Sequence, residues 1–563
     1  MEIPLNPGFL PILAAFAVLA APRAFRAPLM ASAALAAIWL LLDYQFGAAA
    51  AIAHMGLSVV LLNLDALNRI FGIALLIALV AIAIYSGARR NRYEDAAILM
   101  LVGGSVSALF VGDLIIFVAT ASLAGLAASW TVFASTIENA NRAGVRLLIW
   151  HGLEGLLFLV GVALHITAGA ARVEIGRLDV DTIAGACIFA ALMIRVGAPF
   201  AHVWLKDVVS HASPVGGAAL SAFTTMLGVY ALARLFPAEP LLVPIGAGMI
   251  VVGAFYAAAE TDLRRAGAYA LTAQTGVCVA LIGVGSPLAL AAAEGHAFAA
   301  VLAFVALQMV FGAVLERRGS VDVASLQGLS RQMPITALLA LVAGLAVAGV
   351  PGFALYATQA VALEAVAQWD LRWLWLCVAA TPAVLFVSLA LRPALAAFRA
   401  SVPTPIVEAP FPMMLGAALA SFLCVAIGLA PGWLYDLMPT ALTFQPFAID
   451  RVAQQFELLG VAGLIYLALH AVGAAPKARQ IRTLDIDALY RGPFADAGRW
   501  AGVLLLRVYG AWQGAANQAG AATARIVGAM AQLCDRPFAP ARAANVVQFF
   551  TIGAILMMIL LFV

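Results

Sequence analysis

Apolar stretches of about twenty residues follow one another along almost the whole chain, with only short polar segments between them. A helix that crosses a bilayer needs a stretch of this length. Charged residues make up 10% of the chain, whereas a soluble domain carries about 25%, so the polar side chains cannot cover a surface in water. The sequence therefore predicts an all-α polytopic membrane protein rather than a soluble enzyme. The net charge of +3 is too small to indicate nucleic-acid binding.

The candidate spans number about sixteen by the length criterion, and we expect roughly 14–16 transmembrane helices. They lie at residues 8–22, 28–46, 66–86, 95–111, 113–134, 145–168, 182–207, 213–236, 241–259, 265–285, 290–314, 333–363, 372–396, 411–438, 456–474 and 545–563. The first span has no basic region before it, so it is interpreted as a membrane helix and not as a signal peptide.

The basic residues predict the orientation of the spans. If the N-terminus lies outside, twenty-three Arg and Lys residues fall on the inner side and six on the outer side. Short loops rich in Arg and Lys stay on the cytoplasmic side of a membrane. Both termini are therefore predicted to lie outside.

Two of the long spans contain helix-breaking residues. One break comprises Gly197, Ala198 and Pro199, and the other is the Gly-Val-Pro-Gly run at 349–352. Proline removes a backbone donor and clashes with the preceding turn, and irregular backbone at membrane depth is tolerated only when it is buried or lines a wet cavity. Broken helices at corresponding places in two units are typical of inverted-repeat transporters, although proline kinks without transport are also common.

This pattern predicts the domain organisation of the chain. N-terminal membrane helices at 1–112 precede two inverted five-helix repeats at 113–236 and 241–363, and further membrane helices follow at 372–474. At 475–544, apolar residues recur at helical spacing among basic and polar ones, which indicates an amphipathic lateral helix along the cytoplasmic face. A loosely ordered loop is the alternative. A terminal transmembrane anchor is expected at 545–563.

Several short motifs occur in a characteristic order between residues 60 and 495. They are DAL at 65–67, GDL at 112–114, HVWLKD at 202–207, SP at 213–214, LSAFTT at 220–225, DLRR at 262–265, HAFA at 296–299, GL at 328–329, MP at 333–334, GVP at 349–351 and LDIDALYR at 484–491. Together they resemble the antiporter-like membrane subunits of respiratory complex I, Mrp-type sodium/proton antiporters and membrane-bound hydrogenases. The last motif is most similar to Mrp D-type subunits.

The resemblance implies a row of hydrated titratable groups at mid-membrane, beginning with a glutamate paired with a lysine. Counted from the motifs, the titratable positions of the family fall here on Ser122, Arg195, Met226, Ala300, Phe304 and Gln359. Five of these side chains exchange no proton near neutral pH, and arginine stays charged. Met226 and Phe304 also make the walls of the path apolar. The sequence predicts that the proton channel of this chain is degenerate.

Another set of ionisable residues leaves open an alternative to the degenerate channel, a rearranged ion path. His151 and Glu154 lie at i, i+3 on one predicted helix, and Glu154 is a candidate replacement for the missing carboxylate, facing Arg195. The candidate ion path is then Arg195, Glu154, His151 and His202. The structural alternative is a fixed Glu154–Arg195 pair, which holds helices together but relays no proton because arginine does not release one. For His202 we favour a hydrogen bond inside the helix break over a metal-ligand role.

The sequence offers no motif for a cofactor, a metal site or a nucleophilic reaction. The five cysteines form no C-x-x-C pair, so no catalysis is expected from this chain alone. The favoured function is a multi-pass subunit of a complex I-like or Mrp-like assembly in a bacterial inner membrane, with other membrane subunits and lipid as partners and a structural or coupling role. The alternatives are an active antiporter subunit that uses the rearranged path, and a membrane chaperone or stand-alone anchor.

Overall fold

The computed structural model describes residues 4–47, 49–54, 57–88, 91–168, 174–399, 407–440, 442, 444–473 and 500. All helices and strands within these residues belong to one compact unit of the chain. The lateral segment predicted at 475–544 and the anchor predicted at 545–563 lie outside the described residues, apart from Trp500.

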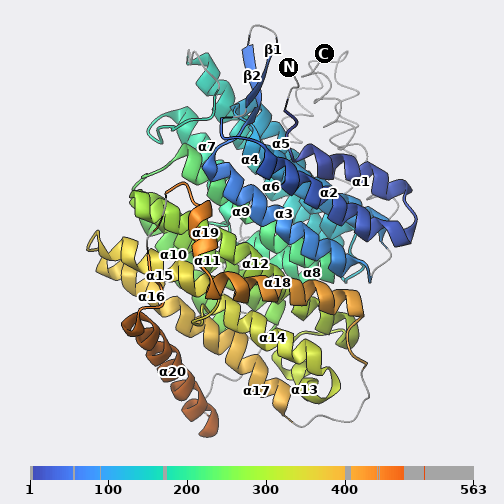
Figure 1. The fold of residues 1–563 in the computed structure, drawn as a ribbon, viewed down its shortest axis with the longest axis vertical. Coiled ribbons are helices and arrows are strands. Elements are labelled where there is room, and N and C mark those ends of the chain that lie inside the picture. Colours follow the sequence, from blue (N-terminus) through green and yellow to red (C-terminus); the bar gives the residue numbers. More distant parts are fainter. Residues whose placement is uncertain are drawn as a thin grey trace. The chain divides into compact units, whose positions relative to one another are not determined.

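Long apolar helices make up nearly all of this unit (Figure 1). Twelve segments are long and apolar enough to cross a membrane: α2 (Arg23–Asp43), α3 (Ala66–Ser86), α4 (Arg92–Phe110), α5 (Leu114–Phe133), α6 (Ala140–Thr167), α9 (Pro214–Leu235), α10 (Leu242–Ala259), α11 (Leu263–Val284), α12 (Pro287–Arg318), the continuous stretch Arg372–Phe398, α18 (Phe411–Leu429) and α20 (Ile449–Ala471). Four shorter apolar helices accompany them: α1 (Phe9–Ala20), α7 (Ile183–Val196), α14 (Pro334–Val347) and α15 (Ala354–Ala367). The prediction of an all-α polytopic membrane protein is confirmed.

Two spans are interrupted where the sequence predicts a break. α7 is followed by α8 (Val203–His211), and α14 is followed by α15. Each predicted repeat thus contains one broken helix, while the inverted relation of the two repeats stays a prediction. The stretch Arg372–Phe398 is also irregular, since the π-helix η2 (Phe386–Leu391) separates α16 (Arg372–Leu385) from α17 (Arg392–Phe398).

The connections differ from the sequence expectation in two places. An antiparallel hairpin of β1 (Ala49–His54) and β2 (Leu57–Asn63) joins α2 to α3, an exception to the all-α prediction. The backbone N–H of Gly112 donates to the carbonyl of Val60 at 3.0 Å and ties the hairpin to the start of α5. The span predicted at 411–438 is shorter than expected, because α18 ends at Leu429 and the chain turns at Pro431 into the short α19 (Gly432–Leu437). The short elements η1 (Val323–Leu326) and α13 (Leu329–Gln332) precede α14.

Acidic residues of the recurring motifs begin three of the helices. The Asp65 carboxylate accepts from the backbone N–H of Asn68 at 3.0 Å, and the Asn68 side-chain oxygen accepts from the backbone N–H of Asp65 at 2.8 Å. Asp113 accepts from Ile115 N–H at 2.7 Å, and Asp262 accepts from the N–H of the second residue after it at 2.8 Å. An N-cap satisfies backbone donors that the first helical turn leaves without a partner. The DAL, GDL and DLRR motifs are therefore helix-start signals.

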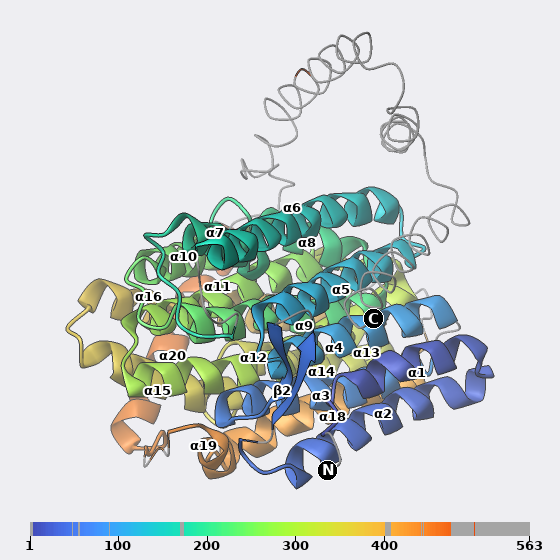
Figure 2. The ribbon, with the colours of Figure 1, turned by 90° about the horizontal axis from the view of Figure 1, so that it is seen from above.

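The 32-residue α12 lies at the centre of the packing. It contacts α3, α9, α11, α14, α15 and α18 (Figure 2). Close approach of neighbouring helices depends on small residues, as at the contact between α10 and α11. A Cβ on Gly246 would lie 2.4 Å from the backbone nitrogen of Ala280, and one on Gly276 would lie 2.7 Å from the carbonyl oxygen of Gly246. Such packing substitutes for hydrophobic association, which is absent between helices in lipid.

Candidate functional site

The first helix break positions Arg195. α7 ends at Val196, and Gly197 follows with φ of +70°, a left-handed conformation that glycine adopts without a steric penalty. The carbonyl of Ile194, at the end of α7, accepts from the backbone N–H of Gly197 at 3.2 Å and from the indole N–H of Trp204, in α8, at 3.0 Å. Arg195 therefore lies in the last turn of α7, next to a helix end that is capped by Gly197 and Trp204.

Arg195 forms a buried ion pair with Glu154 of α6. The guanidinium Nε donates to Glu154 Oε1, and Nη2 donates to the carbonyl of Ala121 in α5 at 3.0 Å. His151 Nδ1 lies 2.7 Å from the other carboxylate oxygen of Glu154. The exposed fractions are only 6% for His151, 1% for Glu154 and 2% for Arg195. Three of the four candidate ion-path residues thus meet in one cluster that joins α5, α6 and α7.

The His151–Glu154–Arg195 triad links α6 to α5 and α7. A guanidinium keeps its charge, so the carboxylate between Arg195 and His151 stays anchored on at least one side. The imidazole of His151 is also fixed against the Trp204 ring, with 5.5 Å between centroids. Within the described part of the chain, His151 Nε2 and Arg195 Nη1 are buried without a hydrogen-bond partner.

Ser122 lies beside the triad, on α5. A Cβ built on Gly155 of α6 would lie 3.3 Å from Ser122 Oγ, so the Ser122 hydroxyl faces the turn of α6 that carries Glu154. The carboxylate of this region is thus on α6, one helix away from the position that the sequence motifs assign to it.

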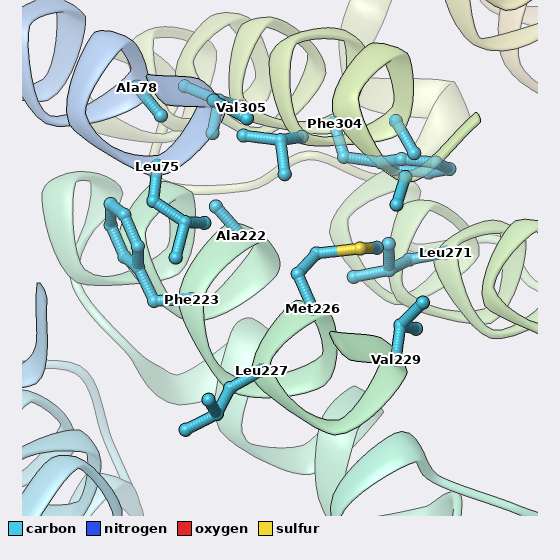
Figure 3. Close-up of a cluster of buried hydrophobic side chains, with 14 of the residues drawn as sticks. Leu75, Ala78, Ala222, Phe223, Met226, Leu227, Val229, Leu271, Phe304 and Val305 are labelled. Atoms are coloured by element: carbon cyan, nitrogen blue, oxygen red, sulfur yellow. The ribbon is translucent and has the colours of Figure 1, made fainter. Parts of the chain in front are cut away.

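Apolar side chains fill the region where the next titratable positions fall. Figure 3 shows Met226 pointing from α9 toward Leu271 of α11, with Phe304 of α12 and Leu75 of α3 in the same cluster. All four side chains are buried. Ala300, one turn before Phe304, is also buried and adds only a methyl group. Met226, Ala300 and Phe304 therefore belong to a packed hydrophobic core.

Neutral polar groups gather at the second break. His296 of α12 lies between Gln274 of α11 and Thr358 of α15: Nε2 is 3.0 Å from Gln274 Oε1, and Nδ1 is 3.1 Å from Thr358 Oγ1. The Gln274 amide also donates to the carbonyl of Val347, in the last turn of α14, at 3.3 Å. Since Gln274 Oε1 only accepts, His296 carries its proton on Nε2, and the Thr358 hydroxyl can donate to Nδ1. This network is complete with a neutral imidazole.

Gln359 faces the same break. Its amide nitrogen donates to the carbonyl of Val378 in α16 at 2.8 Å. Its oxygen would lie 3.3 Å from a Cβ on Gly349, whose φ is +61°. Gln359 thus links α15 to α16 at the position where the family resemblance implies a lysine.

The fourth ion-path candidate, His202, lies in the first break among aromatic rings. Its ring centroid is 6.4 Å from that of Tyr256 and 6.2 Å from that of Tyr269, and it is buried. No group of three or more His, Cys, Asp or Glu side chains among the described residues is arranged to hold a metal ion.

Replacing Gln274 with leucine is expected to destabilise the fold by about 1–3 kcal/mol, because it leaves buried donors and acceptors at the second break without partners. The matched control is Thr272→Val on the same helix, since among the described residues the Thr272 hydroxyl bonds only to the carbonyl of Ala268 one turn earlier. The control should cost less than about 1 kcal/mol. Thermal unfolding in detergent measures both. Equal stability of the two variants would contradict the role assigned to Gln274.

Sequence reasoning missed three buried carboxylates, those of Glu94, Asp95 and Glu294. Glu294 of α12 is buried, and Oε2 has no hydrogen-bond partner among the described residues. Glu94, at the start of α4, accepts from the hydroxyl of Ser213, the N-cap of α9. Glu294 could have been found, because an ionisable residue within an apolar span is a functional candidate by default.

The fold defines a class of protein: a polytopic membrane protein in which two of the membrane helices are broken. Residues 70–385 match the family described as NADH:quinone oxidoreductase/Mrp antiporter, transmembrane, and this match covers more than half of the chain. The chain belongs to this family.

Individual relatives agree with this assignment. The chain is 30% identical over 275 residues to a probable K(+)/H(+) antiporter subunit of Rhizobium meliloti (strain 1021), covering 46% of this chain and 27% of that protein. It thus spans only about a quarter of that relative. A chain of the Mrp complex from Dietzia sp. DQ12-45-1b has the same fold, with a TM-score of 0.69, 17% identity, and coverage of 84% of this chain and 100% of that one. A chain of respiratory complex I from Thermus thermophilus also has this fold, with a TM-score of 0.68 and 20% identity. The match covers 81% of this chain and 99% of that one.

Proposed function

We propose that this chain is a membrane subunit of a multi-subunit, ion-translocating assembly of the complex I or Mrp kind, and that its own proton path is closed. Its role is then structural or coupling, and any driving reaction takes place in a partner. The family membership supports this proposal, as do the similar folds found in an Mrp complex and in respiratory complex I.

The observation that carries the proposal is the packing of Met226 against Leu271 and Phe304. Proton transfer through a membrane protein needs a continuous series of water molecules or titratable groups. Met226 and Phe304 offer neither, and apolar walls favour drying of the space between them. Polar side chains elsewhere in the unit bond to one another, as in the His151–Glu154–Arg195 triad and the His296 network.

The rival function is an active proton/cation antiporter that uses Glu154, His151 and Arg195. The contact between His151 and Glu154 favours it, because an imidazole can both donate and accept a proton. The ion pair disfavours it, because a carboxylate held by arginine is anchored to a cation that does not change its charge. We therefore propose the structural role for the triad.

The proposed location is a bacterial inner membrane, with both termini on the outer side. The distribution of Arg and Lys in the loops supports this orientation. Other membrane subunits and lipid are the proposed partners.

Reconstitution of the purified chain tests the closed path. Proteoliposomes containing it should show no proton or sodium flux above protein-free liposomes, as measured with an internal pH indicator and a sodium-sensitive dye under an imposed ion gradient. Vesicles containing the intact assembly serve as the positive control. A flux through the isolated chain that is lost in Glu154→Gln or Arg195→Lys would exclude the closed path and establish the rival.

A further inference from the structure

The last described helix, α20, has an exposed face that includes a carboxylate. α20 packs against α16 and η2 at one edge of the unit (Figure 1). An exposed stripe runs along its outer side at helical spacing: Gln454, Glu457, Val461, Leu464 and Ala468. Gly460 beside the stripe has no atom within 4 Å of a built Cβ, so this part of the helix is open to close approach.

A contact on the opposite side of α20 indicates how deep in the membrane this stripe lies. The Gln455 amide donates to the carbonyl of Gly349 at 3.1 Å, within the break between α14 and α15. α14 and α15 are each 14 residues long, so about 21 Å of helix lies on either side of the break. Glu457 follows Gln455 by two residues, about 3 Å along the axis. Its Cα therefore lies at the level of the break, well inside the hydrocarbon region.

A carboxylate exposed at this depth is unusual. Ionisable residues within membrane spans nearly always face the protein interior and pair with one another. Glu457 makes no hydrogen bond or ion pair within the described residues, while Arg451, near the outer end of the same helix, pairs with Glu364 at 3.1 Å. Lipid tails provide no donor for a carboxylate. The described residues thus supply no group of complementary charge to Glu457.

We propose that the stripe is the docking surface for a transmembrane helix of a partner subunit, and that this helix carries a lysine or arginine opposite Glu457. Charge complementarity favours this occupant over the chain's own predicted anchor at 545–563, which contains no basic residue. The inference rests on the proposed function, since it requires an assembly. It adds the surface and the chemistry that the partner must present.

A partner helix bound to this surface would be connected through α20 to the second broken helix. Gln455 connects α20 to the break itself, and the Arg451–Glu364 pair connects it to α15. One helix thus contacts the docked partner on one side and the second break on the other.

Crosslinking within the intact assembly tests the proposal. A photoreactive benzoylphenylalanine placed at Val461 should form an adduct with another polypeptide after irradiation of native membranes, and mass spectrometry identifies the partner peptide. An adduct with lipid, or with residues 545–563 of this chain, overturns the docking surface.

Charge reversal provides the second readout. Glu457→Lys should reduce the amount of partner recovered with this chain in mild detergent by about tenfold. Asp450→Lys, the same change on an exposed residue at the outer end of α20, should reduce it less than about twofold. Glu457→Gln should keep the normal amount of chain in the membrane, which separates lost docking from misfolding. Equal recovery with Glu457→Lys and with the wild type overturns the proposal.

The two proposals fail in different ways. If the wild-type chain is recovered without any other subunit, both the proposed function and the docking surface fail. If the assembly is recovered intact but Val461 crosslinks only to lipid, the proposed function stands and the docking surface alone fails.

Discussion

Replacing Glu154 with glutamine is expected to lower the free energy of unfolding by about 3–5 kcal/mol, because the substitution leaves Arg195 buried as an unpaired charge. Arg195 is held by Glu154 Oε1 and by one backbone carbonyl, and its exposed fraction is 2%. Water cannot replace the lost carboxylate without opening the contact between α6 and α7. Thermal unfolding in detergent, or steric trapping in bicelles, measures the change.

The matched control is Glu138→Gln. Glu138 is exposed in the loop between α5 and α6, so its substitution should change stability by less than about 0.5 kcal/mol. The double variant Glu154→Leu/Arg195→Met should recover most of the lost stability, because replacing a buried pair by apolar residues of similar size is often neutral or favourable.

The same variants separate the two roles of the triad. If the pair only joins helices, the double variant assembles and supports the activity of the complex. Loss of coupled ion transport in a double variant that is stable and fully assembled would instead show that the triad takes part in the proton path.

Met226→Lys is expected to destabilise the protein by about 3–5 kcal/mol, because it places an ammonium group in a dry core without a partner. The substitution restores the residue type that the family resemblance implies at this position. In a hydrated channel a lysine would be solvated and tolerated. Here the side chain points toward Leu271 within the apolar core that also contains Phe304.

Met226→Leu is the control for packing, since a swap that nearly conserves volume costs less than about 1.5 kcal/mol. Both variants are compared by their unfolding transitions in the same detergent. A Met226→Lys protein that is as stable as Met226→Leu would show that water reaches this site, and the closed path would have to be abandoned.

Much of the candidate site could be predicted because the motifs mark where helices begin and end, and other positions can be counted from them. Asp113 begins α5, and the Gly197 and Pro199 pair ends α7, so counting from these signals places Ser122 and Arg195 on the correct helices. Met226, Ala300 and Phe304 are located in the same way, and their apolar character is a property of the residues themselves. The proposed closure of the path rests on those side chains together with their packing.

Contacts between distant segments could not be predicted. Glu154 and Arg195 are 41 positions apart in the sequence, and several orientations of α6 are compatible with its apolar pattern. The network of Gln274, His296 and Thr358 joins three helices, and none of the three side chains carries a local signal for its partners. The exposure of Glu457 likewise depends on which face of α20 turns toward α16.

The amino-acid order is sufficient to specify the membrane class of this chain, the positions of its helices and breaks, and the lack of titratable side chains at the usual positions of the path. These properties are local, because a backbone in lipid must satisfy its hydrogen bonds within each apolar stretch, and glycine and proline mark where it does not. Packing between helices, by contrast, brings Glu154 onto Arg195, joins Met226 and Phe304 in one apolar core, and leaves Glu457 facing outward. Those outcomes depend on the rotation of each helix and on contacts between segments far apart in the chain, which hydropathy does not encode.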